Sequence, residues 1–253
     1  MFGFPNVRGS CWVNTCLQCI FRIPELQKRY TDEHADTTNP IDMSLQTIWR
    51  SKGKDGLSVF FETVHSKLMP AGKGIGDTHE LFQSLCDKLP FVDELVRFKI
   101  ADSIQCANCS HKEIREDSVT EFSVTSTSPN MSLTECIADA VKPQTIDTWK
   151  CETCGKQGCT KQQLIGSFPK LMVFHALPSK HSIAYASVLA LNQRDYALCA
   201  VACYNGGHWW AYGRDMPVGS SWYTLNDQHV QNHGAKQFPM SNQMRVLIYY
   251  RLD

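Results

Sequence analysis

The sequence predicts an α+β fold in which helices come first, strands come last and a metal-binding insertion lies between them. Apolar residues recur at helical spacing between positions 13 and 21, and Pro24 disfavours continuation of that helix. Segments 196–204 and 244–250 are rich in apolar and β-compatible residues, which predicts strands. Two Cys-x-x-Cys motifs lie between these regions. These three observations set the order of the fold along the chain.

The remaining elements follow the same order. Residues 28–40 are polar and predict a loop, whereas residues 47–68 show helical spacing and predict further helix. Residues 119–127 are compatible with a strand, and a further strand at 221–225 ends at Asn226. The chain shows no internal repeat, so we expect one domain.

Composition limits the classes of function. The 25 basic and 25 acidic residues cancel, so no overall basic field favours a nucleic-acid partner. With 43% hydrophobic and 20% charged residues, the chain has the composition of a globular protein. No apolar run approaches the roughly 18 to 20 residues of a membrane span, and no secretory signal is visible. We therefore expect neither nucleic acid nor a membrane as partner.

Cys11 is the first candidate catalytic residue because it lies where a helix begins. Ser10 is placed to cap that helix, and the helix N-terminus would stabilise a thiolate and lower the pKa of Cys11. Asn6, five residues earlier, is placed to donate to an oxyanion. A buried structural cysteine is the alternative interpretation, because the chain has 12 cysteines.

His208 is the candidate general base. It follows Gly206 and Gly207, which leave no side chain over the backbone and allow another chain to approach the imidazole. Downstream, Asn226 and Asp227 end a predicted strand, and either could orient the imidazole. A satisfied interior histidine and an ordinary turn are the alternatives. The order Cys, His, Asn/Asp favours a cysteine protease.

The cysteine pairs predict a structural zinc ion. Each Cys-x-x-Cys delivers two sulfurs from one tight turn, and two such turns complete a tetrahedral site. Cys159 or His111 could replace one ligand, and a redox motif is disfavoured because it needs only one pair. The four predicted ligands are Cys106, Cys109, Cys151 and Cys154.

These motifs resemble those of the ubiquitin-specific proteases. Segment 3–14 is similar to the cysteine box of this family, and segments 206–212 and 222–227 are similar to its histidine box. The resemblance covers nearly the whole chain. It implies a papain-like α+β domain with a helical thumb at about 1–97, zinc-bearing β fingers at about 98–163 and an antiparallel β palm at about 164–253.

The resemblance also implies roles for residues. Cys11 would be the nucleophile, Asn6 the oxyanion donor and His208 the base, oriented by Asn226 or, as in some members, by Asp227. Further residues would contact ubiquitin. Asp77 and Glu80 would be carboxylates that grip its basic tail, and Gly206 and Gly207 would be the glycines before the base. Trp12 and Trp209 would form aromatic walls of the cleft.

Some positions depart from the family pattern or keep a structural interpretation. Arg8 replaces a glycine three residues before the nucleophile, and the basic pair expected after His175 is missing. We expect His175 to be structural. Asp77 and Glu80 also suit the first turn of a helix, a role that does not exclude contact with a substrate.

The combined prediction is an intracellular cysteine isopeptidase of the cytoplasm or nucleus, because both thiolate sites need a reducing compartment. Its substrates would be ubiquitin or ubiquitin conjugates, its only cofactor a structural zinc ion, and its state a monomer. Alternatives are a protease for SUMO, NEDD8 or an interferon-induced ubiquitin-like protein, a protease for a viral polyprotein, and a catalytically weak ubiquitin-binding scaffold. A zinc-ribbon nucleic-acid binder is disfavoured by the neutral charge.

Overall fold

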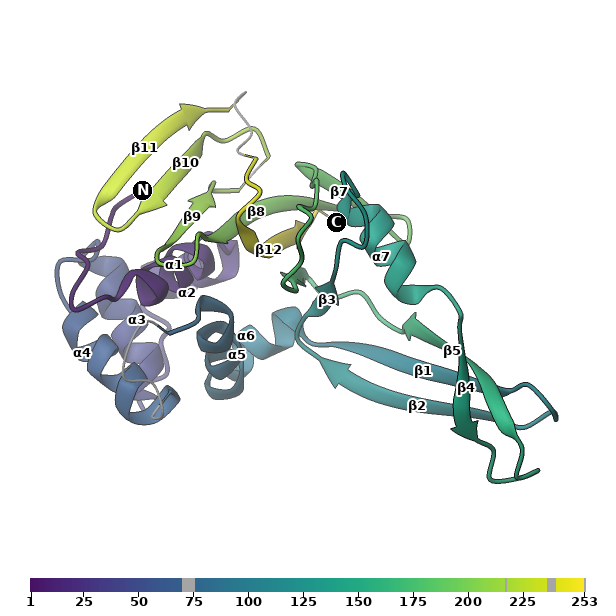
Figure 1. Ribbon diagram of the computed structural model, residues 1–253. Helices are drawn as coiled ribbons and strands as arrows, with labels where there is room; N and C mark the ends of the chain where they lie inside the picture. Colours follow the sequence, from purple (N-terminus) through teal and green to yellow (C-terminus); the bar gives the residue numbers. More distant parts are fainter. Residues whose placement is uncertain (70–75, 217, 236–239, 253) are drawn as a thin grey trace.

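The computed structural model describes residues 1–69, 76–216, 218–235 and 240–252 of the chain. It confirms the predicted α+β class, with helices leading and strands following (Figure 1). The helical elements are α1 (Cys11–Ile20), α2 (Pro24–Thr31), α3 (Pro40–Arg50), α4 (Leu57–Thr63), a π-helical turn η1 (Val64–Leu68), α5 (Thr78–Lys88), α6 (Pro90–Val96) and α7 (Leu133–Val141).

The strands form two sheets. A four-stranded antiparallel sheet has the order β2-β1-β5-β4, and an eight-stranded sheet has the order β11-β10-β9-β8-β12-β6-β3 with β7 paired to β8. In the larger sheet, the described pairs are antiparallel except β3 with β6. The strands are β1 (Phe98–Cys106), β2 (Lys112–Val119), β3 (Phe122–Val124), β4 (Gln144–Lys150), β5 (Gln157–Ile165), β6 (Leu171–Ala176), β7 (Val188–Leu191), β8 (Arg194–Tyr204), β9 (Trp209–Gly213), β10 (Trp222–Asn226), β11 (His229–Gly234) and β12 (Met244–Arg251).

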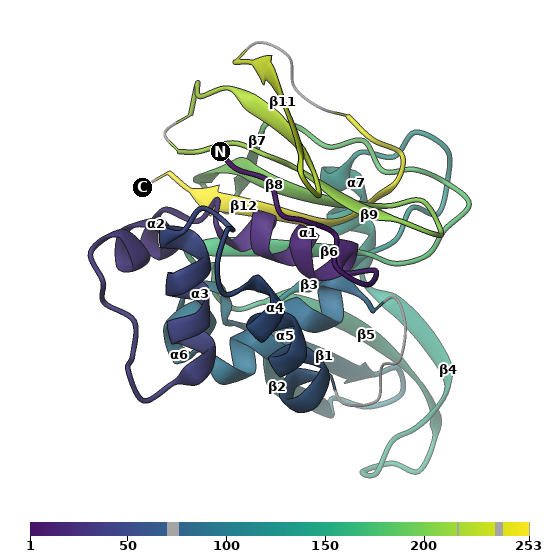
Figure 2. The same ribbon diagram turned by 90° about the vertical axis from the view of Figure 1, so that its left-hand side faces the viewer.

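Helix α1 is the central helix of the molecule. All ten of its residues are buried, because it packs against β8, β9 and β10 on one side and α5 on another (Figure 2). Buried polar side chains in such a helix need internal partners. Gln18 and Asn14 find them in the N-terminal segment: Gln18 Nε2 donates to the carbonyl of Phe2 at 2.7 Å, and Asn14 Nδ2 to that of Pro5 at 3.1 Å. The helix therefore fixes the chain that precedes it.

The eight-stranded sheet has an apolar core on each face. Side chains alternate along a strand, so Leu171 and Val173 face the helices around α1, while Met172 and Phe174 face the core that contains α7. Burial on both faces explains why the first four residues of β6 are all apolar rather than alternating with polar ones.

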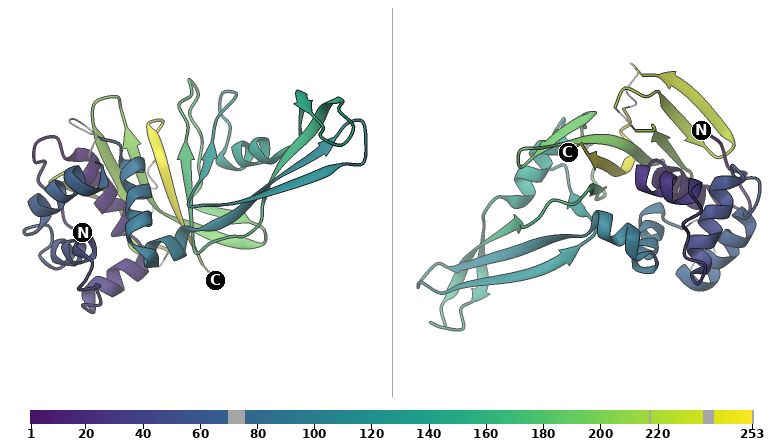
Figure 3. Two further views of the ribbon diagram at one scale, coloured as in Figure 1. Left: turned by 90° about the horizontal axis from the view of Figure 1, so that it is seen from below. Right: turned by 180° about the vertical axis from the view of Figure 1, so that it is seen from behind.

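The four-stranded sheet projects away from the rest of the molecule (Figure 3). Its outer strands β2 and β4 are mostly exposed, so this sheet has little apolar core of its own. The boundaries predicted for thumb, fingers and palm stay a prediction. None of the described helices combines the length and hydrophobicity that crossing a membrane requires.

Candidate active site and cysteine cluster

Cys11 is the first residue of α1, as predicted, and is only 2% exposed. Its thiol lies 3.9 Å from the carbonyl oxygen of Gly9, to which it donates. The main-chain N–H of Trp209, the residue after His208, lies close enough to the Cys11 sulfur to lower the pKa of that thiol. The sulfur near the start of the chain therefore lies close to the first residue of β9, nearly two hundred residues later in the sequence.

The expectation of a lowered pKa for Cys11 is wrong for the free protein. Burial raises the pKa of the Cys11 thiol, the Trp209 N–H lowers it and the charge of Asp227 raises it further. Ser10 occupies the N-cap position, but its hydroxyl accepts from the N–H of Val7 at 2.9 Å rather than from the first turn. The increase in the pKa of Cys11 caused by burial is larger than the decrease expected from the helix N-terminus, so Cys11 is a thiol in the free protein.

His208 is held by its loop and by β10. Asn205 Oδ1 accepts from the main-chain N–H groups of Gly207 at 3.1 Å and His208 at 2.9 Å, which fixes the turn. Nε2 of His208 lies 2.7 Å from Oδ1 of Asn226. Since that oxygen can only accept, Nε2 carries the proton and Nδ1 remains free as a base.

Asp227 makes different contacts from its neighbour. Its Oδ2 lies 4.0 Å from His208 Nε2 and accepts from Asn6 Nδ2 at 2.8 Å. Its Oδ1 accepts from Asn14 Nδ2, also at 2.8 Å. Of the two predicted orienting residues, Asn226 therefore contacts the imidazole, and Asp227 fixes the amide of Asn6.

Asn14 is a site residue to which the sequence assigned no role. One turn after Cys11 in α1, it bonds both Pro5 and Asp227. The N-terminal segment is also held by its backbone, because the N–H of Phe4 donates to the carbonyl of Asp227 at 2.9 Å. The available signal was the position of Asn14 within the cysteine box, on the same helix face as the nucleophile.

The residues predicted to contact ubiquitin lie around this centre. Asp77 caps α5 and accepts from the N–H of His79 at 2.7 Å, and Glu80 is exposed in the first turn. Trp12 and Trp209 are buried, at 1% and 3% exposure. A Cβ atom at Gly206 would meet nothing within 4 Å, and one at Gly207 only the Asn205 side chain at 4.0 Å. These two glycines leave the approach to His208 open.

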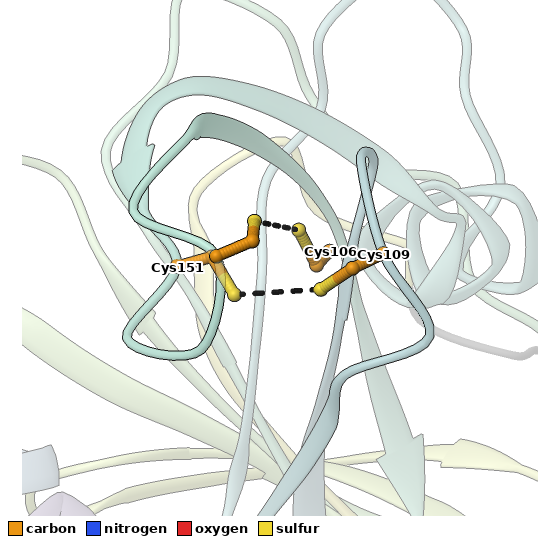
Figure 4. Close-up of side chains that lie close together, drawn as sticks. Cys106, Cys109 and Cys151 are labelled. Carbon is orange, nitrogen blue, oxygen red and sulfur yellow. Dashed lines mark hydrogen bonds between the residues drawn. The ribbon is translucent and has the colours of Figure 1, made fainter.

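The four predicted zinc ligands form one cluster (Figure 4). The sulfurs of Cys106 and Cys154 are 3.8 Å apart, as are those of Cys109 and Cys151. Sulfurs bound to a tetrahedral zinc ion at about 2.3 Å are about 3.8 Å apart. The donor set and spacing therefore fit zinc.

The proposed substitutes for a ligand lie outside this cluster. Cys159 is buried opposite Cys106 in the pairing of β1 with β5, and His111 contributes a backbone carbonyl to the Cys106 N–H at 3.0 Å. Neither belongs to the group of four sulfurs. A second group of side chains of the types that bind metals, which the sequence did not indicate, consists of His79, Glu121 and His175.

A central helix that begins at a cysteine and packs on an antiparallel sheet carrying the histidine defines the papain-like class of α+β proteins. Within that class, the chain belongs to the ubiquitin carboxyl-terminal hydrolase family, whose sequence model, described as "Ubiquitin carboxyl-terminal hydrolase", matches residues 2–249.

Relatives of known sequence are distant and longer. Ubiquitin carboxyl-terminal hydrolase Usp2 of Drosophila melanogaster is 20% identical over 98% of this chain and 34% of its own length. Ubiquitin carboxyl-terminal hydrolase 2 of Gallus gallus is 25% identical over 64% of this chain and 53% of its own. The chain thus spans about a third to about a half of these relatives.

Solved structures share the fold. Ubp8 in the SAGA DUB module with Sgf11, Sus1 and Sgf73, bound to monoubiquitin, has a TM-score of 0.82 at 18% identity, covering 100% of this chain and 69% of that one. The module bound to ubiquitin aldehyde gives 0.77 at 17% identity, covering 100% and 70%. These matches confirm the predicted fold class.

Proposed function

We propose that this chain is a cysteine isopeptidase that cleaves after the C-terminal Gly-Gly of ubiquitin. The observation that carries the proposal is the contact network around His208: its Nε2 is bonded to Asn226, and the next residue's N–H contacts the Cys11 sulfur. Membership of the family supports ubiquitin as the substrate, and solved relatives of this fold were seen with ubiquitin bound.

The proposed mechanism follows from the hydrogen bonds of the site, which leave Nδ1 of His208 available to accept a proton. Nδ1 of His208 takes the proton of Cys11, and the thiolate attacks the carbonyl carbon of the terminal glycine. Asn6 and backbone amides donate to the resulting oxyanion, and Asp227 fixes the Asn6 amide. The imidazolium protonates the leaving lysine amine to give a thioester. His208 then activates water, which releases ubiquitin and restores the thiol.

The recognition residues suit a narrow, basic tail. We propose that Asp77 and Glu80 meet arginine side chains of an extended peptide, because Asp77 caps α5 and Glu80 lies in the first turn of that helix. Gly206 and Gly207 would admit the diglycine, with Trp12 and Trp209 supporting the walls beneath it. Zinc bound by the cysteine cluster supplies a structural crosslink and takes no part in the chemistry.

The decisive experiment uses ubiquitin with a thiol-reactive C-terminus. Wild type should form a one-to-one covalent adduct, Cys11→Ala should form none, and Cys16→Ala, a matched buried cysteine of the same helix, should react like wild type. No adduct with folded wild-type protein would favour the scaffold function instead. Probes built on SUMO, NEDD8 and an interferon-induced ubiquitin-like protein test the alternative modifiers, and a Gly-Gly peptide probe tests the polyprotein alternative.

We further propose that the chain acts as a monomer in a reducing compartment of the cell. All twelve of its cysteines are free, which fits the need for reduced sulfur at both sites. Light scattering of the purified chain, with and without ubiquitin, tests the monomer. Ubp8 was solved together with three further proteins, so a requirement for partners is the alternative outcome.

A further inference from the structure

Three side chains from separate parts of the chain meet beside the start of α5. His79 lies in the first turn of that helix, Glu121 directly precedes β3, and His175 lies in β6. Their side chains are 10%, 12% and 19% exposed. The parallel pairing of β3 with β6 places Ser123 opposite His175, which brings Glu121 into reach of the imidazole.

The ligand atoms already converge. Nε2 of His79 is hydrogen-bonded to Oε2 of Glu121, and Nδ1 of His175 lies 3.7 Å from Oε1 of the same carboxylate. The two imidazole rings stack with their centroids 3.6 Å apart and their planes at 16°. All three ligand atoms lie within 4.8 Å of one another.

We propose that His79, Glu121 and His175 bind a zinc ion, distinct from the one assigned to the cysteine cluster. Two imidazoles and a carboxylate are a ligand set that zinc takes in proteins, at bonds of about 2.0 to 2.2 Å. Ligand atoms around such an ion are about 3.4 Å apart. Binding would therefore replace the hydrogen bond between His79 and Glu121 by two metal bonds and move these two ligand atoms apart, draw the His175 nitrogen closer to the carboxylate, and tilt the two imidazole rings out of their stack. The fourth position would be taken by water.

The surroundings supply both protection and access. All three side chains are at least four-fifths buried, and Glu121 also lines a surface hollow of about 540 Å³ that is bordered by Gln83 and Arg97. An ion could enter along that hollow. Once bound, it would crosslink α5 to β6 and to the residue before β3, and would fix the helix start that carries Asp77 and Glu80.

This proposal does not depend on the proposed protease activity, because its test counts metal ions. After dialysis against zinc and removal of free metal, wild type should hold two zinc ions per chain by elemental analysis. Glu121→Gln and His175→Gln should hold one, Cys106→Ser should also hold one, and His34→Gln, an exposed histidine of the thumb, should hold two.

A second measurement protects the test against misfolded variants. Zinc titration of wild-type protein with ¹⁵N-labelled histidine should shift the resonances of two imidazoles, those of His79 and His175. One zinc ion per wild-type chain that is lost in Cys106→Ser and kept in Glu121→Gln would overturn the proposal. Histidine resonances of wild type that do not respond to zinc would overturn it as well.

Discussion

Asn226 and Asp227 are neighbours with different partners. Asn226 is the last residue of β10 and bonds His208, whereas Asp227 begins the turn to β11 with a φ of 51°. Asp227 lies outside the strand, in the left-handed conformation that the turn requires and that Asp tolerates, so its carboxylate reaches Asn6 while staying 4.0 Å from His208 Nε2. Asn226 therefore orients the imidazole of His208, and Asp227 positions the side-chain amide of Asn6.

This division predicts different couplings in mutants. Asn226→Ala should lower kcat/KM for a ubiquitin substrate by about 10²- to 10⁴-fold, because the imidazole loses its orienting acceptor. Asp227→Asn keeps the turn but can accept from only one of its two amide partners, so kcat should fall by up to about a hundredfold. Steady-state kinetics in an Asn6→Ala background separates the two roles. In that background, Asp227→Asn should cause little further loss of kcat, whereas Asn226→Ala should lower kcat/KM by as much as it does in wild type.

If the losses of kcat caused by Asp227→Asn and by Asn6→Ala were additive in the double mutant, Asp227 would not act through Asn6 and the assignment would be wrong.

The pKa of Cys11 gives a prediction about pH. Because burial and then Asp227 raise the pKa of this thiol, the free protein should carry a protonated Cys11 at neutral pH, and its alkylation rate should rise with pH through a midpoint above the ordinary thiol value. Asp227→Asn removes a negative charge, which favours the thiolate, so its midpoint should move to lower pH. The measurement is the iodoacetamide rate at Cys11 followed by mass spectrometry. A midpoint well below that of a free thiol would show a preformed thiolate–imidazolium pair instead.

Arg8 shows how a residue that departs from the family pattern is accommodated. It stands where the resemblance of the cysteine box predicts glycine, and it adopts a left-handed φ of 54°, followed by Gly9 at 80°. The loop before Cys11 thus keeps a conformation that glycine adopts readily, at a cost of about 1 to 2 kcal/mol for a residue with a Cβ atom. The side chain is free to leave the cleft and pairs with Glu62 at the surface, at 3.3 Å.

At the scale of elements, the secondary structure of apolar segments could be predicted from the sequence, whereas that of polar segments could not. The predicted break at Pro24 is confirmed, since α1 ends at Ile20 and Pro24 begins α2. The predicted loop at 28–40 is wrong at its start, because α2 continues to Thr31 and buries only Leu26 and Tyr30. Strand β11 has no apolar alternation, being an exposed edge strand whose pairing with β10 supplies its order.

The docking of the N-terminal segment on the β10–β11 turn gives an element-level prediction. A Cβ atom at Gly3 would lie 2.6 Å from the carbonyl oxygen of Gln228 and 2.7 Å from that of Asp227, both backbone atoms that cannot move aside alone. Gly3→Ala should therefore displace the segment that carries Asn6, and kcat should fall with a modest loss of thermal stability. Gly207→Ala is the matched control, because its Cβ atom would meet only the Asn205 side chain, at 4.0 Å. Its melting temperature should match that of wild type, while its affinity for ubiquitin should fall. Unchanged kcat in Gly3→Ala would show that the docking does not position Asn6.

At the scale of the whole molecule, local sequence motifs predicted individual site residues, but only the three-dimensional fold shows which residues from distant segments lie together. Each cysteine pair is a motif of four adjacent residues, so the four-cysteine cluster could be predicted from the sequence. Cys11 and His208 are nearly two hundred residues apart, and only their motifs suggested a meeting that the packing of α1 on β9 accounts for. No local pattern joins His79, Glu121 and His175, because each comes from a different element and their contact exists only in three dimensions.

Removing zinc from the cysteine cluster should loosen one end of the molecule and spare the other. The four-stranded sheet carries its cysteines at the turns β1–β2 and β4–β5 and has mostly exposed outer strands, so little apolar burial would replace the lost crosslink. Helix α1 and the eight-stranded sheet keep their own buried cores. Cys106→Ser should therefore increase amide hydrogen exchange in β1, β2, β4 and β5, while exchange in β8 and alkylation of Cys11 stay as in wild type.

Cys159→Ser is the matched control, since this buried cysteine lies outside the cluster. Amide hydrogen exchange in this variant should match that of wild type. Increased exchange spread evenly over both sheets would mean that the zinc ion stabilises the whole domain rather than the tip of its projecting sheet.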